Sequence, residues 1–321
     1  MTHTDTGQDP GSSPGRSRGW LPGRPVGRVG YGVRQLALQA VGRDGGVELL
    51  RRAVELGVDH IDTADFYGGG AASDLICAAL HPYPDEIAIV SKVGVRHDHD
   101  RGLVPAQRPE ELRVSVEANL RRLGTDRLAM VYLRRVDTGP RLIATGDQQV
   151  DIEIQLAELI ELRDEGKIGG IGLSNVNLHQ LRRALPAGVV GVQNIYNYVE
   201  RAYESVFQEC RLHDIAWVPF FPMGSPEAAM RVSEHPAVIE AASVLGATPT
   251  QVGLAWLLAH DPRILLVPGT ADLAHLEENL AAADIDLDDR TKATLDAALP
   301  RSVAATVDAG GPAQEYGDPA P

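Results

Sequence analysis

The 321-residue sequence predicts a single-domain α/β protein built as a (β/α)8 barrel. Eight short apolar runs alternate with longer stretches in which apolar residues recur at helical spacing, which implies a parallel sheet with right-handed crossovers. The eight units fall within about 275 residues, a length that suits a closed barrel better than an open sheet. The glycines of residues 27–32 lack the spacing of a dinucleotide-binding turn and do not open a helix, so an open nucleotide-binding sheet is disfavoured.

Each expected element has a local signal. Leucines recur on one face of 48–56 and of 110–123, which predicts two helices. Asp151 can cap a third helix that ends at Gly166, and a fourth over 249–258 begins with proline. The expected strands are the apolar runs 28–32, 58–62, 87–92, 128–134, 168–173, 189–194, 215–220 and 264–268.

Both ends of the chain differ in composition from the part between them. Residues 1–26 are rich in Gly, Pro, Ser and Thr, and residues 302–321 are similar. Such segments cannot bury enough apolar surface to offset the entropy lost on ordering. We therefore expect a disordered N-terminal tail over 1–26, a folded barrel over 27–301 and a flexible C-terminal tail over 302–321.

Composition restricts the class of partner. The net charge is −14 and the isoelectric point about 5.1, so the surface should repel nucleic acid and anionic lipid. No run approaches the ~20 apolar residues of a membrane helix. Cys77 and Cys210 have no metal-like spacing, and the N-terminus lacks a signal-peptide pattern, so the cytoplasm is the expected location. The oligomeric state is not defined by the sequence, and a monomer is compatible with it.

Reactive side chains cluster at three consecutive strand ends, where a barrel carries its active site. Asp62, Lys92 and Arg134 end the second, third and fourth strands, and Tyr67 follows in the loop after the second. An ammonium beside a phenol favours the phenolate, so Tyr67 could donate a proton to a carbonyl oxygen. An ordinary ion pair of Asp62 with Lys92, with Tyr67 merely packing, remains open at this point. Arg135 should point to the opposite face of its strand from Arg134.

Five motifs occur in order along the folded unit: HIDTADFYG, IVSK, GKIGGIGLSN, VQNIYN and VPGTADLAHLEEN. In this order they resemble the aldo-keto reductase superfamily. The resemblance implies NADP(H) as cofactor and a small-molecule carbonyl substrate, with Asp62, Tyr67 and Lys92 in three of the four catalytic positions. It also implies a set of cofactor contacts. Ser174, Asn175 and Gln193 would hold the nicotinamide carboxamide, Phe220 would stack on the nicotinamide, Met223 and Ser225 would lie in the loop over the pyrophosphate, and Gly269, Thr270, His275, Glu278 and Asn279 would grip the adenosine end.

The sequence departs from the common family pattern in three places. Arg134 occupies the fourth catalytic position, where histidine is usual. Gly269 and His275 replace cations that often bind the 2′-phosphate, and the loop after the first strand is short. The arginine, together with the motifs FFPMG, VPGT and AHLEEN, most resembles the bacterial pyridoxal reductase branch.

The expected function is reduction of a small aldehyde or ketone to its alcohol, with pyridoxal as a candidate substrate. A barrel that binds NADP(H) as a sensor, with little turnover, is the alternative. A metal hydrolase using His97 and His99 is remote, because no further ligands stand at later strand ends, and no metal site is expected.

Overall fold

The computed structural model describes residues 18–38, 41–137, 142–226 and 228–299. Seven parallel strands form one curled sheet in the order β11-β10-β9-β8-β5-β4-β3. The strands are β3 (Tyr31–Gly32), β4 (His60–Asp62), β5 (Ala88–Val93), β8 (Met130–Arg134), β9 (Ile171–Ser174), β10 (Val189–Gln193) and β11 (Ala216–Trp217). The segment 264–269 makes parallel bridges to Trp217 on one side and to Val29 and Gly32 on the other. This segment is the eighth strand, so the predicted closed barrel is confirmed.

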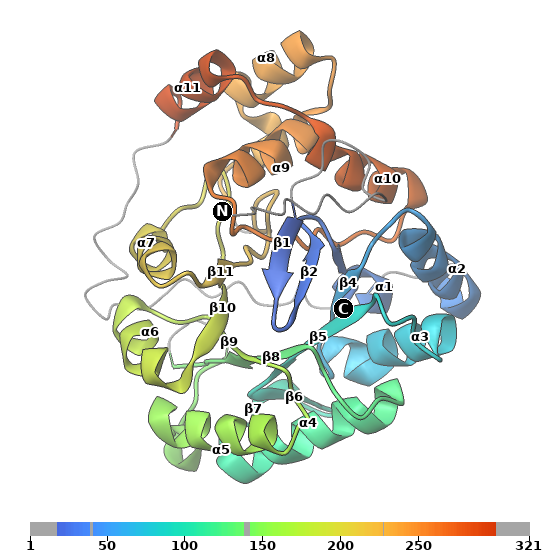
Figure 1. Cartoon of the computed structure of the whole chain (residues 1–321), viewed down its shortest axis with the longest axis vertical. Coiled ribbons are helices and arrows are strands. Elements are labelled where there is room, and N and C mark those ends of the chain that lie inside the picture. The colour runs from blue at the N-terminus through green and yellow to red at the C-terminus, as the bar shows by residue number, and fades with distance from the viewer. Residues whose placement is uncertain (1–17, 39–40, 138–141, 227, 300–321) are drawn as a thin grey trace, which may run out of the picture.

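Helices surround the sheet, and Figure 1 shows them as an outer ring around the strands. Their bounds are α1 (Arg34–Leu38), α2 (Gly42–Glu55), α3 (Ala71–Leu80), α4 (Pro109–Leu123), α5 (Ile152–Asp164), α6 (Leu178–Ala184), α7 (Glu204–Leu212), α8 (Pro236–Leu245), α9 (Pro249–His260), α10 (Leu273–Ala281) and α11 (Asp289–Ala297). The four helices expected from the sequence are α2, α4, α5 and α9. Asp151 caps α5 by accepting from the N–H of Glu153 at 2.9 Å, as predicted.

The period of two along the strands separates the barrel interior from the layer under the helices. On β5, Ala88 and Val90 face the interior, where they pack with Met130 and Tyr132 of β8. The residues between them, such as Ile89, pack in the large core beneath the helices. The next interior position after Val90 is Lys92. The interior of β5 and β8 is therefore apolar until the carboxyl ends, where Lys92 and Arg134 stand.

The structure corrects the expected boundary of the N-terminal tail. Residues 18–26 were expected to be disordered, but they form an antiparallel hairpin of β1 (Arg18–Leu21) and β2 (Arg24–Gly27). Leu21 and Val26 are buried against the interior residues of the barrel, which offsets the entropy cost of ordering the hairpin. Figure 1 shows the hairpin across the centre of the barrel. The remaining tail predictions, for 1–17 and 302–321, fall outside the described residues.

A second hairpin, β6 (Val95–Asp98) and β7 (Gly102–Pro105), follows β5. It carries His97 and His99, which are exposed to solvent. In the described part of the chain no three His, Cys, Asp or Glu side chains form a group able to hold a metal.

No single helix in the described ranges is long and apolar enough to span a membrane, although α8 and α9, bent by 96°, pass that test of length and composition as a pair.

Candidate active site

The structure contains a cavity at the mouth of the barrel, where the strands end and the loops begin. Asp62, Lys92 and Arg134 are each the last or nearly last residue of β4, β5 and β8, three strands that are direct neighbours in the sheet. They line a cavity of about 340 Å³ together with Tyr67. Because parallel strands all end on the same side of the barrel, this is the face on which barrel enzymes carry their chemistry.

Asp62 and Lys92 form a buried ion pair. The ammonium of Lys92 contacts the Asp62 carboxylate and also donates to the carbonyl of Thr63 at 3.0 Å. The side-chain amide of Gln193 donates to the second carboxylate oxygen of Asp62 at 2.9 Å. A buried carboxylate is tolerated only when it is paired and hydrogen-bonded, and both oxygens of Asp62 are. Lys92 is therefore held in one position by its partners.

Tyr67 reaches this pair from the loop after β4. It begins a short 3-10 turn, Tyr67–Gly70, in which the last three residues are glycines with φ values of 58°, 62° and 100°. Such left-handed conformations favour glycine. At Gly70 a Cβ atom would lie 2.1 Å from the Arg122 guanidinium, so a side chain there would also collide. The three glycines let the chain turn sharply behind Tyr67 and leave its ring against Lys92.

The contact between Tyr67 and Lys92 is electrostatic as well as geometric. The Lys92 nitrogen lies 5.0 Å from the centre of the Tyr67 ring, close enough for the charge of one side chain to act on the other. Burial alone would lower the pKa of Lys92, but Asp62 and Tyr67 outweigh it and raise that pKa above its usual value. Lys92 is thus a permanent cation beside a phenol, as the strand ends predicted.

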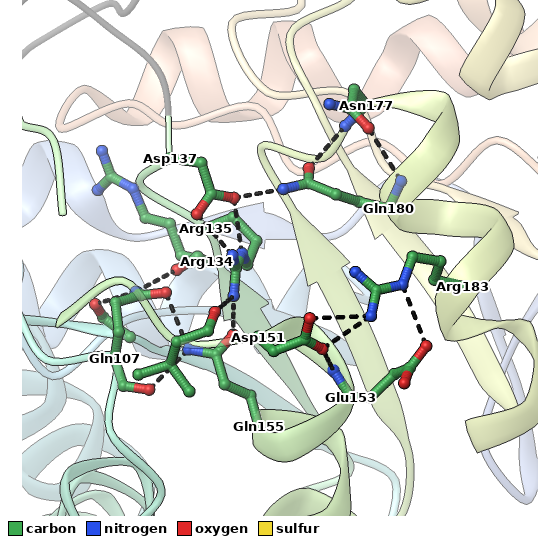
Figure 2. A network of polar contacts seen from close by, with 12 residues as sticks. Gln107, Arg134, Arg135, Asp137, Asp151, Glu153, Gln155, Asn177, Gln180 and Arg183 are labelled. Atoms are coloured by element: carbon green, nitrogen blue, oxygen red, sulfur yellow. Dashed lines mark hydrogen bonds and ion pairs between the residues drawn. The ribbon is translucent and has the colours of Figure 1, made fainter. Parts of the chain in front are cut away.

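Arg134 lies near Tyr67, over the ring of Phe66. Its guanidinium carbon is 5.4 Å from the centre of the Phe66 ring, and Phe66 packs edge to face on Tyr67 with ring centres 5.2 Å apart. Its backbone is fixed by Gln107, whose side-chain amide donates both to the carbonyl of Arg134 at 2.9 Å and to that of Gly94. Gln107 thereby joins the ends of β5 and β8 (Figure 2).

Arg135 points away from Arg134, and Figure 2 shows the two guanidinium groups diverging. Arg135 is 6% exposed, forms a two-bond ion pair with Asp137 and donates to the carbonyl of Val150 and to Gln155. Gln155 in turn donates to the carbonyl of Gln107 at 2.6 Å. Arg135 is therefore part of the polar network that supports the strand end, and it is unsuitable as a neutral control for Arg134.

Most of the expected cofactor contacts line the same cavity. Ser174 and Gln193 are buried at the ends of β9 and β10, and Asn175 follows in the left-handed region with φ of 57°. Amide and hydroxyl donors, an aromatic ring and a cation, Arg231, occur together there, and this donor set fits a group that combines an amide, a planar ring and phosphates. The cofactor residues expected from the sequence that line the cavity are Ser174, Asn175, Gln193, Phe220, Met223, Gly269 and Asn279.

Four expected cofactor residues do not line the cavity: Ser225, Thr270, His275 and Glu278. The hydroxyl of Ser225 donates to Glu200 at 2.7 Å, and Glu278 accepts from the hydroxyl of Thr248. The Thr270 hydroxyl accepts from the N–H of Asp272 at 3.1 Å.

The fourth of them, His275, is exposed in the first turn of α10. Each of the other three has a polar partner within the protein. That these four residues contact the cofactor remains a prediction.

Several lining residues were not identified from the sequence: Arg34, Gln35, Phe66, Tyr203, Phe221 and Arg231. Arg34 and Gln35 directly follow the first predicted strand, so the rule used for the other strand ends would have found them. Arg231 reaches the cavity from a segment with no such signal, since only the folded chain brings it beside Met223 and Gly224.

The mouth of this barrel combines Asp62, Tyr67 and Lys92 with hydroxyl and amide donors. This arrangement is typical of one class of protein, the carbonyl reductases built on a barrel. The model of the Aldo/keto reductase family matches residues 28–300. The chain belongs to the aldo/keto reductase family, a family of oxidoreductases, which confirms the prediction from its motifs.

Individual relatives agree with this assignment. Pyridoxine 4-dehydrogenase of Escherichia coli is 42% identical over 279 residues, covering 85% of this chain and 95% of that protein. An uncharacterised oxidoreductase of Schizosaccharomyces pombe is 32% identical, covering 84% of this chain and 86% of that protein. An aldo-keto reductase structure from Klebsiella pneumoniae in complex with NADPH is 25% identical, with a TM-score of 0.77, and the match covers 91% of this chain and 98% of that one.

Proposed function

We propose that this protein reduces a small aldehyde or ketone to its alcohol with NADPH, and that Tyr67 donates the proton. The observation that carries the proposal is the half-buried phenol of Tyr67 beside Lys92, whose nitrogen lies 5.0 Å from the ring centre and is paired with Asp62. A phenol ordinarily holds its proton up to a pH of about 10. A fixed ammonium beside the phenol stabilises the negative charge left on its oxygen after the proton is transferred.

Each side chain of the site has a distinct part in this reaction. NADPH, when bound, supplies the hydride that adds to the carbonyl carbon. Ser174, Asn175 and Gln193 offer hydroxyl and amide groups that would orient the nicotinamide amide, and Phe220 offers a ring for stacking. Arg134 would donate hydrogen bonds to the carbonyl oxygen as negative charge develops there, because a guanidinium is a donor that keeps its proton.

NADPH is proposed over NADH for two reasons. The Klebsiella relative was solved with NADPH. In this chain Arg231 adds a cation to the cavity that Met223, Gly269 and Asn279 also line. A cation there compensates for Gly269, which leaves no charge where many relatives carry one.

Pyridoxal is the first substrate to examine, since the Escherichia coli relative is a pyridoxine 4-dehydrogenase. Dehydrogenation of that alcohol and reduction of the corresponding aldehyde are one reaction in opposite directions.

The experiment that tests the proposal replaces Tyr67 by Phe. Tyr67→Phe should lower the turnover number by about 10²- to 10⁴-fold, while the Kd for NADPH stays near that of the wild type. Tyr83→Phe is the matched control, because the Tyr83 hydroxyl donates to the carbonyl of Leu123 and does not line the cavity. Near-normal turnover of Tyr67→Phe would remove tyrosine from the proton-donor role. A wild type that binds NADPH but reduces no aldehyde would instead favour a sensor.

A further inference from the structure

The cavity is electropositive in a strongly acidic protein. Four of its described lining residues are cations, Arg34, Lys92, Arg134 and Arg231, and one, Asp62, is an anion. The lining therefore has three excess positive charges, whereas the chain as a whole has a net charge of −14. Charge concentrated in a cleft against the overall sign of the protein indicates that the cleft binds anions.

Three of the four cations already have a function. Lys92 is paired with Asp62 beneath Tyr67. Arg231 stands on the wall proposed for the phosphates of NADPH, and Arg134 is proposed to meet the carbonyl oxygen. Arg34 has no function in the proposed reaction.

Arg34 lies next to the reacting centre. It is the first residue of α1 and follows the end of β3 by two positions, so it stands at the mouth of the barrel. It is half-buried, and it lies close enough to Tyr67 for the two side chains to interact electrostatically. Burial lowers the pKa of Arg34 and the charge of the Tyr67 oxygen opposes this effect, but a guanidinium retains its proton throughout the working range of pH. The site beside Tyr67 thus has a permanent second positive charge.

We propose that Arg34 binds an anionic group, a carboxylate or a phosphate monoester, that the substrate carries in addition to its carbonyl. The inference rests on the proposed carbonyl reduction and narrows its substrate class to anionic aldehydes or ketones. A planar guanidinium matches both kinds of anion through two parallel hydrogen bonds. It would hold the anionic end of the substrate while the carbonyl faces Tyr67.

The test compares matched substrates in wild type and Arg34→Met, which keeps an unbranched side chain and removes the charged guanidinium. One pair is 4-carboxybenzaldehyde and 4-methylbenzaldehyde, and the other is pyridoxal 5′-phosphate and pyridoxal. The measured quantity is the ratio of kcat/KM within each pair, and comparing this ratio between the two proteins cancels the intrinsic reactivity of the aldehydes. Arg43→Met is the control, because Arg43 is exposed in the first turn of α2, outside the cavity.

We expect the preference for the anionic member to fall about 10- to 100-fold in Arg34→Met, mainly through KM, as loss of a charge-assisted hydrogen bond predicts. If the ratio of kcat/KM falls only within the benzaldehyde pair, the subsite binds a carboxylate. If it falls only within the pyridoxal pair, the subsite binds a phosphate. Binding supplies a second readout without turnover. The Kd of 4-carboxybenzyl alcohol for the enzyme with NADPH, two molecules that cannot react together, should rise similarly, whereas the Kd of benzyl alcohol should not.

Three outcomes would overturn the anion subsite. An equal loss on neutral and anionic aldehydes would mean that Arg34 acts through Tyr67. An unchanged preference would leave it without a substrate role. A weaker Kd for NADPH with unchanged preference would assign it to the cofactor. Reduction of the neutral aldehydes without anionic preference would leave the proposed reduction intact. Failure to reduce any aldehyde would refute the reduction, and the alcohol titration would still decide the subsite.

Discussion

Arg134 is the residue at which this chain departs most from the common pattern of its family, since histidine is usual in its place. A guanidinium cannot exchange protons near neutral pH, so its contribution must come from hydrogen bonds to the carbonyl oxygen. Arg134→Met should lower kcat by about 10²-fold, because one positioned donor is typically worth about 3 kcal/mol in the transition state. Steady-state kinetics with a neutral aldehyde provides the measurement.

The control for Arg134 must be an arginine outside the buried network. Arg183 is suitable, because it is partly exposed and pairs with Asp151 and Glu153. Arg183→Met should keep kcat. If Arg134→Met also keeps kcat and only lowers the melting temperature, the carbonyl role of Arg134 is wrong.

Arg231 is exposed and lines the cavity, as does Met223. Its removal should weaken binding of NADPH about tenfold, the usual effect of losing one charged hydrogen bond. Fluorescence titration of Arg231→Met with NADPH and NADH measures the change. A larger loss for NADPH than for NADH assigns the contact to the 2′-phosphate, and equal losses assign it to the pyrophosphate. An unaltered Kd for both would exclude Arg231 from cofactor binding.

At the scale of elements, Gln107 couples two strand ends. Its amide donates to the carbonyls of Gly94, after β5, and Arg134, at the end of β8. Gln107→Leu leaves two buried carbonyls without this donor, which should cost about 1–3 kcal/mol of stability each at most. Because β5 carries Lys92 and β8 carries Arg134, we also expect a lower kcat with little change in KM.

Thermal unfolding and steady-state kinetics of the same variant test this coupling. The control is Gln208→Leu, since Gln208 is exposed on α7 and bonds Glu204 and Arg211. A Gln107→Leu protein that is less stable but keeps its kcat would show that the bridge supports the fold and does not align the site.

At the scale of the whole molecule, partly buried histidines make stability depend on pH. The imidazole of His260 stacks on Trp256 and Phe207 with ring centres 4.9 and 5.3 Å away. Burial lowers its pKa below the usual 6.5, despite the opposing charge of Glu204. The unfolded chain then binds a proton that the folded chain does not, so stability is lost as pH falls through about 6.5 toward the lower folded-state pKa.

His260→Phe removes this group and preserves the stacking. Urea unfolding at pH 7.5 and at pH 5.5 should show a smaller loss of stability on acidification in the variant than in the wild type. His235, whose pKa is also lowered by burial, should sustain part of the dependence in both proteins. An identical loss in the two proteins would contradict the assignment to His260.

Much of the architecture followed from the sequence because it depends on short-range rules. Alternating apolar runs and helical repeats predicted the barrel, and Asp151 predicted the start of α5 through its cap. The strand-end rule located Asp62, Lys92 and Arg134, since parallel strands present their last residues on one face. The eighth strand was expected as a continuous strand, whereas it contributes isolated bridges at Ile264, Leu266 and Gly269.

Long-range packing decided the rest. The hairpin of 18–27 has a composition typical of disorder, and only the barrel interior that buries Leu21 and Val26 makes it ordered. Strand alternation predicted that Arg135 points away from Arg134, but only the fold shows that Arg135 joins a polar network with Asp137 and Gln155.

Apolar periodicity and motifs therefore predicted the barrel, the family and the strand-end positions of Asp62, Lys92 and Arg134, because all of these depend on local spacing. The tertiary structure decided that Arg231 adds its charge to the same cavity, because Arg231 belongs to a segment that ends no strand and reaches the cavity only in the folded chain.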